Sequence, residues 1–203
     1  SMKNSLLSLL CVVAGAFGLS AAEVTDVLTN AGFGIGQTTT YKTYADKQFS
    51  SDAVYTMQGA GDAETLQLRT KNNNSGIVST VSGGQLVSVS VKWNAKTGDA
   101  RILDIYGSNV AYTDPADLYS AEKAGTKIGS LAMADGDKTF TVAGDYAFVG
   151  VRSNDGALYM DEVSIVWETG GEVTTVSRPV IAPNGGEISA TTEISISCAT
   201  DAA

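Results

Sequence analysis

The chemistry open to this chain is limited first by a side chain that it lacks. The 203 residues include no histidine, which excludes Ser-His-Asp triads, Cys-His pairs and histidine-ligated metals. Paired carboxylates can hydrolyse a glycosidic bond when they flank it. However, Asp161 and Glu162 are adjacent in a predicted strand and point to opposite faces, and Asp135 and Asp137 lie in a turn without an apolar wall. We therefore expect no enzymatic activity; the remaining route to a hydrolase is through carboxylates distant in the sequence.

Asp161 is the residue best placed to bind a metal ion. It lies near the start of the last predicted strand of the domain, before an alternating apolar run. Calcium takes several oxygen ligands, some of them backbone carbonyls, and Asp26, Asp52 and Asp155 lie in or beside predicted loops. A structural calcium ion at Asp161 is one expectation, and the alternative is that Asp161 accepts hydrogen bonds from a neighbouring loop. No other cofactor is predicted.

A second candidate site consists of aromatic and polar side chains on the strand faces opposite the aliphatic core. If Val149 and Val151 point inward, their alternating neighbours point outward. Aromatic rings stack on the apolar faces of sugar rings, and Arg and Asp bind hydroxyl groups, so these residue types suit a saccharide platform. The predicted ligand-binding residues are Asp104, Tyr106, Tyr112, Tyr119, Tyr146, Phe148 and Arg152. The alternative is that their rings pack under the loop over residues 109–124 as a second small core.

Residues 145–167 are the stretch that positions much of this site. Val149 and Val151 alternate with Gly150 and Arg152, and a similar alternation follows up to Trp167. Alternation at period two is typical of strands that bury one face. Because an Asp-Gly turn separates the two runs, the stretch predicts a β-hairpin.

The rest of the chain repeats this pattern. Turn-separated strand runs are expected at residues 38–44, 53–58, 64–70, 76–81, 85–94, 101–108, 126–131 and 138–143, with a helical turn near 115–118. About ten short strands with little helix predict an all-β fold, an antiparallel β-sandwich of jelly-roll type.

The net charge and the first 22 residues limit which kinds of partner and which cellular location we expect. A formal charge of −9 argues against a nucleic-acid partner, which would require a basic surface, and we expect none. Lys3, an apolar run and the small residues Ser20, Ala21 and Ala22 predict a signal peptide over residues 1–22. We expect a protein that is secreted, periplasmic or on the cell surface, with no direct membrane insertion after cleavage.

Several segments resemble known domains. Residues 71–78, 91–94, 103–108, 109–119 and 149–153 resemble a β-sandwich domain common in secreted and surface proteins of gut-anaerobe bacteria. That resemblance covers residues 23–167 and implies no catalytic residues. After a Gly/Thr-rich linker at 169–178, residues 179–203 resemble the start of the immunoglobulin-like domain at the C-terminus of chitobiases and β-hexosaminidases, truncated before its tyrosine-rich strand.

The sequence therefore predicts four parts: a signal peptide (1–22), a sandwich domain (23–168), the linker and the truncated module. The expected function is that of a non-catalytic accessory module that binds a glycan or another cell-surface component, with further domains of the same chain downstream. The alternative is a structural or adhesion module with a protein partner and no sugar site. A glycoside hydrolase fragment is the third hypothesis.

Overall fold

The computed structural model describes residues 21–170, 180–182 and 195–197. They belong to two units, of which one spans Ala21–Gly170. In the other, β12 (Val180–Ala182) pairs antiparallel with β13 (Ser195–Ser197). The predicted signal peptide and linker, apart from the ends that adjoin Ala21–Gly170, and most of the predicted C-terminal module lie outside the described residues. Within those residues, no helix has the length and apolar character needed to cross a membrane.

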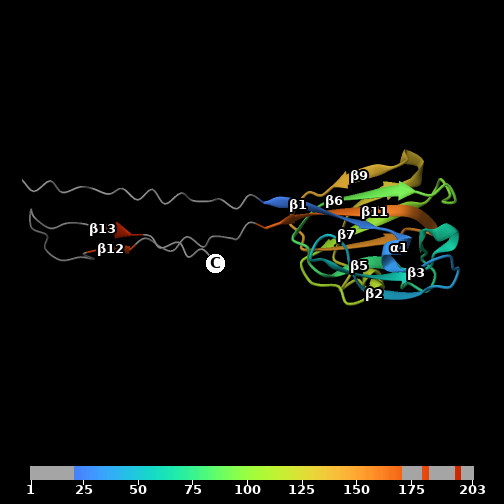
Figure 1. Ribbon diagram of the computed structural model, residues 1–203, viewed down its shortest axis with the longest axis horizontal. Helices are drawn as coiled ribbons and strands as arrows, with labels where there is room; N and C mark the ends of the chain where they lie inside the picture. Colours follow the sequence, from blue (N-terminus) through green and yellow to red (C-terminus); the bar gives the residue numbers. More distant parts are fainter. Residues whose placement is uncertain (1–20, 171–179, 183–194, 198–203) are drawn as a thin grey trace, which may run out of the picture. The chain divides into compact units, whose positions relative to one another are not determined.

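The unit Ala21–Gly170 is an all-β sandwich of two antiparallel sheets, as predicted (Figure 1). The first, sheet A, has the order β1 (Ala22–Leu28), β11 (Leu158–Thr169), β6 (Gln85–Trp93) and β9 (Lys138–Thr141), and β4 (Leu66–Leu68) also pairs with β11. The second, sheet B, has the order β2 (Lys42–Gln48), β3 (Val54–Gly59), β5 (Gly76–Val81), β10 (Phe148–Ser153), β7 (Ile102–Ser108) and β8 (Thr126–Ala132). The short helices are α1 (Asn30–Phe33), η1 (Asp62–Glu64), η2 (Pro115–Tyr119) and η3 (Met133–Asp135).

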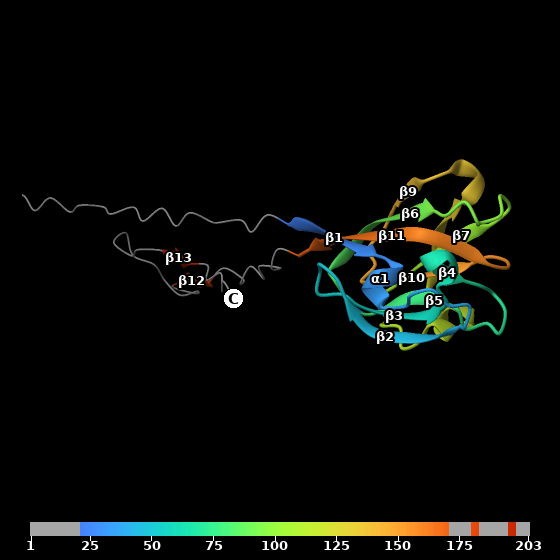
Figure 2. The same cartoon turned by 45° about the vertical axis from the view of Figure 1, so that its right-hand side comes forward.

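The strand order is that of a jelly roll with an insertion. If β2, β3 and β4 are set aside, eight strands remain, and counting them along the chain gives orders 1-8-3-6 and 2-7-4-5 in the two sheets. These orders are two interlocked Greek keys. Figure 2 shows the inserted strands β2 and β3 extending sheet B on one side, and β4 beside the far end of β11.

Alternate residues of both sheets fill the space between the layers. Val149 and Val151 of β10 face Val163, Ile165 and others of β11 in one cluster of buried side chains. This alternation follows from the opposite directions of successive Cβ atoms along a strand. The inward side predicted from the sequence for these strands is therefore confirmed.

The predicted hairpin over residues 145–167 is wrong. β10 pairs with β5 and β7 in sheet B, whereas β11 pairs with β1, β4 and β6 in sheet A. The turn between them crosses from one sheet to the other, and it is tied to β7 because Asn154 donates its backbone N–H to Ile102 O (3.0 Å). Two strands that bury one face in the same core show the same alternation whether they share a sheet or face each other.

A buried carboxylate joins the sheets at one end of the core. Asp26 on β1 is fully buried, and it accepts five hydrogen bonds, from Ser50 N, Ser51 N, Ser51 Oγ, Tyr55 OH and Trp167 Nε1. The donors come from the β2–β3 loop, β3 and β11, so one side chain ties four segments together. A buried polar side chain is tolerated because hydrogen bonds replace its hydration. Burial and the Asp26 hydrogen bond raise the pKa of Tyr55.

Candidate functional site

The structure gathers most of the predicted platform on the outer face of sheet B. β7 and β10 are neighbours, with Arg152 opposite Asp104 and Gly150 opposite Tyr106. Phe148 is on the same face of β10, and Tyr112 and Tyr119 come from the loop that follows β7. Six of the seven residues predicted from the sequence therefore lie together.

This face is covered by the loop over residues 109–124. Tyr106 is 7% exposed and Tyr112 is 2% exposed. We call the group the covered cluster: it comprises Val78, Tyr106, Tyr112 and Leu118, with Tyr119, Ala124 and Phe148 partly buried beside it. A sugar ring cannot stack on Tyr106 or Tyr112 in this arrangement. The second small core, stated above as the alternative, is what the structure contains.

The polar members of this face are occupied by partners within the fold. The Arg152 guanidinium lies over the rings of Tyr119 (4.4 Å) and Tyr106 (5.3 Å), and its Nε donates to Tyr106 OH (3.1 Å). Asp104 is buried and pairs with Lys127 Nζ at 2.8 Å. These contacts hold the cluster together, so they indicate a structural role for Arg152 and Asp104.

Asp117 fixes the covering loop itself. Its Oδ2 accepts hydrogen bonds from Thr113 N and Oγ1 and from Asp114 N, at 2.8 to 3.3 Å. Lys123 Nζ lies 3.4 Å from its other oxygen. Burial favours the neutral carboxyl, but the Thr113 and Asp114 hydrogen bonds outweigh it, so the pKa of Asp117 is lowered.

Tyr146 lies on the other side of sheet B, contrary to the prediction. It precedes β10, where the chain has left the regular alternation, and its ring packs against the main core. A Cβ placed on Gly107, which belongs to the inward-facing row of β7, would meet the Tyr146 ring at 2.6 Å. The prediction assumed that the alternation of β10 continues back to Tyr146, but the strand begins at Phe148.

Asp161 accepts a hydrogen bond from a neighbouring loop, as the alternative to calcium predicted. Asn94 Nδ2 donates to its Oδ1 at 2.9 Å. Within the part of the chain that the structure describes, there is no group of three or more His, Cys, Asp or Glu residues that could hold a metal ion. Of the other carboxylates considered, Asp26 has both oxygens occupied and Asp155 pairs with Arg101 at 3.0 Å. The calcium expectation has no support from side-chain geometry.

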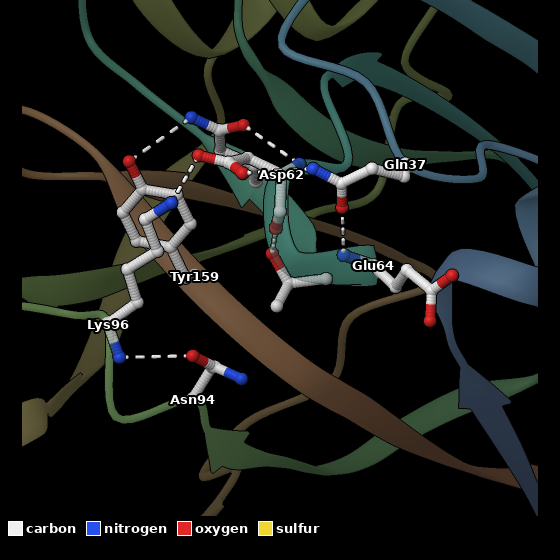
Figure 3. Close-up of polar contacts among 8 residues, drawn as sticks. Gln37, Asp62, Glu64, Asn94, Lys96 and Tyr159 are labelled. Carbon is white, nitrogen blue, oxygen red and sulfur yellow. Dashed lines mark hydrogen bonds and ion pairs between the residues drawn. The ribbon is translucent and has the colours of Figure 1, made fainter.

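A different surface emerges beside Asp161, at the outer face of sheet A. Tyr159 alternates with the buried Leu158 and Met160 on β11 and points outward, opposite Gln67 of β4. Gln67 Nε2 donates to Tyr159 OH (3.3 Å), and Lys96 Nζ lies 5.0 Å from the centre of the Tyr159 ring (Figure 3). We call this group and its neighbours the Tyr159 surface: it comprises Gln37, Tyr41, Asp62, Gln67, Arg69, Lys96 and Tyr159.

The backbone of Tyr159 is held by the loop after β6. Thr97 Oγ1 donates to Tyr159 O (2.6 Å) and accepts from Tyr159 N (2.9 Å). Asn94 N also donates to Tyr159 O (3.0 Å), and its Oδ1 accepts from Lys96 N (3.0 Å). The backbone of Tyr159 is therefore fixed in position, while its side chain remains partly exposed.

The charged groups of the surface balance each other. Lys96 Nζ donates to Asp62 Oδ2, and Gln37 Nε2 donates to Asp62 Oδ1 at 3.2 Å (Figure 3). These two hydrogen bonds lower the pKa of Asp62, and the Asp62 hydrogen bond raises the pKa of Lys96. Both groups are therefore ionised at neutral pH, and together they add no net charge to the surface.

Tyr41 and Arg69 complete the surface. The Arg69 guanidinium stacks on the Tyr41 ring, with Cζ 3.6 Å from the ring centre. Burial raises the pKa of Tyr41 to about 12, although the positive charge of Arg69 opposes the rise. Tyr159 is among the groups close enough to influence the Tyr41 hydroxyl, so the two tyrosines belong to one face.

Strained backbone lies at the edge of this surface. Ala63 and Glu64 in η1 both have φ of 56°, in the left-handed region that costs an L-residue roughly 1–2 kcal/mol. Hydrogen bonds hold the turn, because Glu64 N donates to Gln37 Oε1 (3.0 Å) and Thr65 Oγ1 donates to Asp62 O (2.7 Å). Such strain is concentrated at functional sites in proteins. A hollow of about 400 Å³ adjoins it, lined by Glu64, Asp161 and the α1 region.

The Tyr159 surface was not predicted from the sequence, although the sequence does indicate which way some of its side chains face. Gln67 and Arg69 alternate with Leu66 and Leu68, which marks them as outward-facing. The pairing of β4 with the first half of β11 is what brings them beside Tyr159. Strand order is set by the whole fold, so the signal was incomplete without it.

Comparison with known proteins gives no family: no protein-family model, no curated protein and no solved structure matches the chain. The two resemblances described from the sequence therefore stay predictions.

Proposed function

We propose that the unit Ala21–Gly170 is a non-catalytic module of an exported protein that binds a glycan through the Tyr159 surface. The observation that carries this proposal is the combination of two partly exposed tyrosines, Tyr41 and Tyr159, with charged and amide groups around them. Tyrosine rings provide apolar faces for sugar rings. Amide, carboxylate and ammonium groups supply the few directed hydrogen bonds that orient a ligand.

The setting of the surface supports binding more than turnover. Asp62 is engaged by Lys96 and Gln37, and its pKa is lowered. A general acid for glycoside cleavage needs a raised pKa. An ionised carboxylate such as that of Asp62 can accept hydrogen bonds from hydroxyl groups, but it cannot donate a proton.

The proposal is tested by affinity electrophoresis of the full chain, without its signal peptide, through gels that contain plant, host or microbial polysaccharides. Retardation by at least one polysaccharide is expected for the wild type. Tyr159→Ala should abolish the retardation, because it removes both the ring and the hydroxyl that Gln67 contacts.

Phe148→Ala is the matched control, since it removes a partly buried aromatic ring from the covered cluster. We expect it to be retarded like the wild type, provided that circular dichroism shows it folded. Retardation that survives Tyr159→Ala but is lost in folded Phe148→Ala would show that the glycan binds to the outer face of sheet B. An absence of retardation in every gel would contradict glycan binding.

The covered cluster favours a second candidate function, a structural or adhesion module with a protein partner and no sugar site. Burial of Tyr106 and Tyr112 removes the platform that the sequence predicted. Under this alternative the Tyr159 surface is a polar contact area for a protein partner. No polysaccharide then retards the wild type, and Tyr159→Ala has no effect on its migration.

A further inference from the structure

Arg69 differs from most cations of the described chain because no carboxylate neutralises it. Six ion pairs occur within the described residues, and they engage Lys92, Lys96, Arg101, Lys123, Lys127 and Lys138. Arg69 is in none of them, although Asp62 lies on the same surface. Its guanidinium has the Tyr41 ring as its neighbour at 3.6 Å. Arg152 is the other described arginine outside these ion pairs, but its Nε donates to Tyr106 OH, whereas Arg69 Nε has no hydrogen-bond partner.

The side chain of Arg69 is held in place rather than free in solvent. It is half-buried, and its Nε is enclosed without a hydrogen-bond partner. On either side of this side chain, the Arg69 backbone N–H donates to Ser75 Oγ (3.2 Å) and its carbonyl accepts from Tyr119 OH (3.3 Å). Enclosed polar groups without a partner are uncommon in proteins, so the guanidinium is not saturated by the fold. Since Nε is enclosed, an incoming ligand would meet the terminal nitrogens.

A guanidinium is planar and presents its donors in a fixed geometry that fits the oxygens of a carboxylate or sulfate. Stacking on Tyr41 reduces the freedom that Arg69 would lose on binding. The acidic group nearby, Asp62, is neutralised by Lys96, so it does not repel an anion strongly. The surface therefore combines an available cation with two aromatic rings.

We propose that the Tyr159 surface selects glycans that carry anionic groups, a uronate carboxylate or a sulfate ester, and that Arg69 binds the anion. This inference rests on the proposed function and names the class of sugar for the same surface. Tyr159 contacts the sugar ring and its hydroxyls, while the terminal nitrogens of Arg69 receive the charged oxygens.

The experiment compares polymers that differ in charge alone. Polygalacturonate is paired with its methyl ester, and dextran sulfate with dextran, and binding of the full chain without its signal peptide is measured by affinity electrophoresis in 0.15 M salt. We expect retardation by at least one charged polymer and at least about tenfold weaker binding by its neutral partner, as for the loss of a hydrogen-bonded charge. The polymer that binds identifies the anion as carboxylate or sulfate.

Arg69→Gln tests the residue, and Arg101→Gln is its matched control. Each change removes one positive charge, and the charge of Arg101 is already paired with Asp155 at the turn before β11. Arg69→Gln should weaken binding of the charged polymer about tenfold or more, whereas Arg101→Gln should leave it within about twofold. Arg69→Lys should recover part of the loss, because it restores the charge without the planar geometry.

The remaining outcomes separate the two proposals. Equal retardation by charged and neutral polymers, abolished by Tyr159→Ala but unchanged in Arg69→Gln, would overturn the anion selectivity and leave glycan binding intact. Equal losses in Arg69→Gln and Arg101→Gln would also overturn it, since net charge alone would then explain the binding. Retardation by none of these polymers would overturn the anion selectivity, and the wider polysaccharide set described above then decides whether glycan binding fails as well.

Discussion

On the outer face of sheet B, Arg152 lies over Tyr119 and Tyr106, and the loop over residues 109–124 buries Tyr106 against the strands, while Tyr119 on the loop itself is partly buried. On the outer face of sheet A, Lys96 lies over Tyr159 and Arg69 stacks on Tyr41, but both rings remain partly exposed. The residue types are the same in the two regions. What differs is whether a segment of the same chain covers them, so composition alone cannot separate a second core from a binding surface.

The covering loop explains why sheet B is closed. Leu118 in η2 is 1% exposed, and it rests on two glycines of sheet B, Gly76 and Gly150. A Cβ on Gly150 would come within 2.4 Å of Leu118 Cδ2. The missing side chains let the loop approach the strands closely. Loops also contribute Gln37, Tyr41 and Lys96 to the Tyr159 surface, but the Tyr41 and Tyr159 rings stay partly exposed there.

The largest effect is expected from Leu118→Ala. It removes the residue that fills the space above both glycines, so the free energy of unfolding should fall by about 2–5 kcal/mol. Urea denaturation followed by tryptophan fluorescence measures this change. A loss of less than about 1 kcal/mol would mean that the loop does not pack on sheet B, and the distinction between the two faces would fail.

Asp117→Asn should destabilise the chain by about 1–2 kcal/mol at neutral pH, since charge-assisted hydrogen bonds to Thr113 and Asp114 are lost. The pKa of Asp117 is lowered in the folded state. Its contribution is therefore complete above its unfolded-state pKa of about 3.9 and disappears as the pH falls through the folded-state pKa.

Urea denaturation of the wild type and Asp117→Asn from pH 7 to about pH 2 gives this profile directly. The two proteins should converge at the acidic end. A difference in unfolding free energy that stays constant over the whole range would show that Asp117 acts through packing instead of charge.

Tyr159→Ala should have a smaller effect on stability, a loss of about 1 kcal/mol or less, because the ring is partly exposed and buries little area. Its effect on glycan retardation should nevertheless be complete. Comparison with Leu118→Ala under the same conditions tests the two faces against each other. A larger loss of stability from Tyr159→Ala than from Leu118→Ala would reverse the comparison.

The smallest effect is a gain from Ala63→Gly. Ala63 is exposed and has φ of 56°, a conformation that glycine adopts without steric cost. We expect the free energy of unfolding to rise by about 0.5–1 kcal/mol, since relief of strain is offset in part by the entropy of glycine in the unfolded chain. Thermal denaturation monitored by circular dichroism measures it, and a clear loss would show that the turn is unstrained.

The fold could be predicted from the sequence because period-two alternation reports directly on burial. β5 (Gly76–Val81) has the predicted bounds, and β6 differs by one residue. The hairpin was wrong because alternation carries no information about which strand is the neighbour. The strand expected at 38–44 begins at Lys42 instead, since the β-branched residues before it, Thr38 to Thr40, lie in the connection from α1.

The site was predicted less well, for the same physical reason. Tyr106, Phe148 and Arg152 were correctly placed on one outward face, because strand parity determines it. Whether a loop covers that face depends on Gly76 and Gly150, which leave space for Leu118. Such close packing between distant segments is not visible in the alternation of a single strand. Arg69 and Tyr159 are far apart in the chain and meet only through the pairing of β4 with β11.

Hydrogen–deuterium exchange of the whole chain, with and without an oligogalacturonide, determines which face of the sandwich contacts the ligand. Binding at the open face predicts slower exchange over residues 62–69 and 94–97 and around Tyr159, and unchanged exchange over residues 109–124. Protection confined to residues 109–124 would place the ligand on the covered face of sheet B and contradict the account.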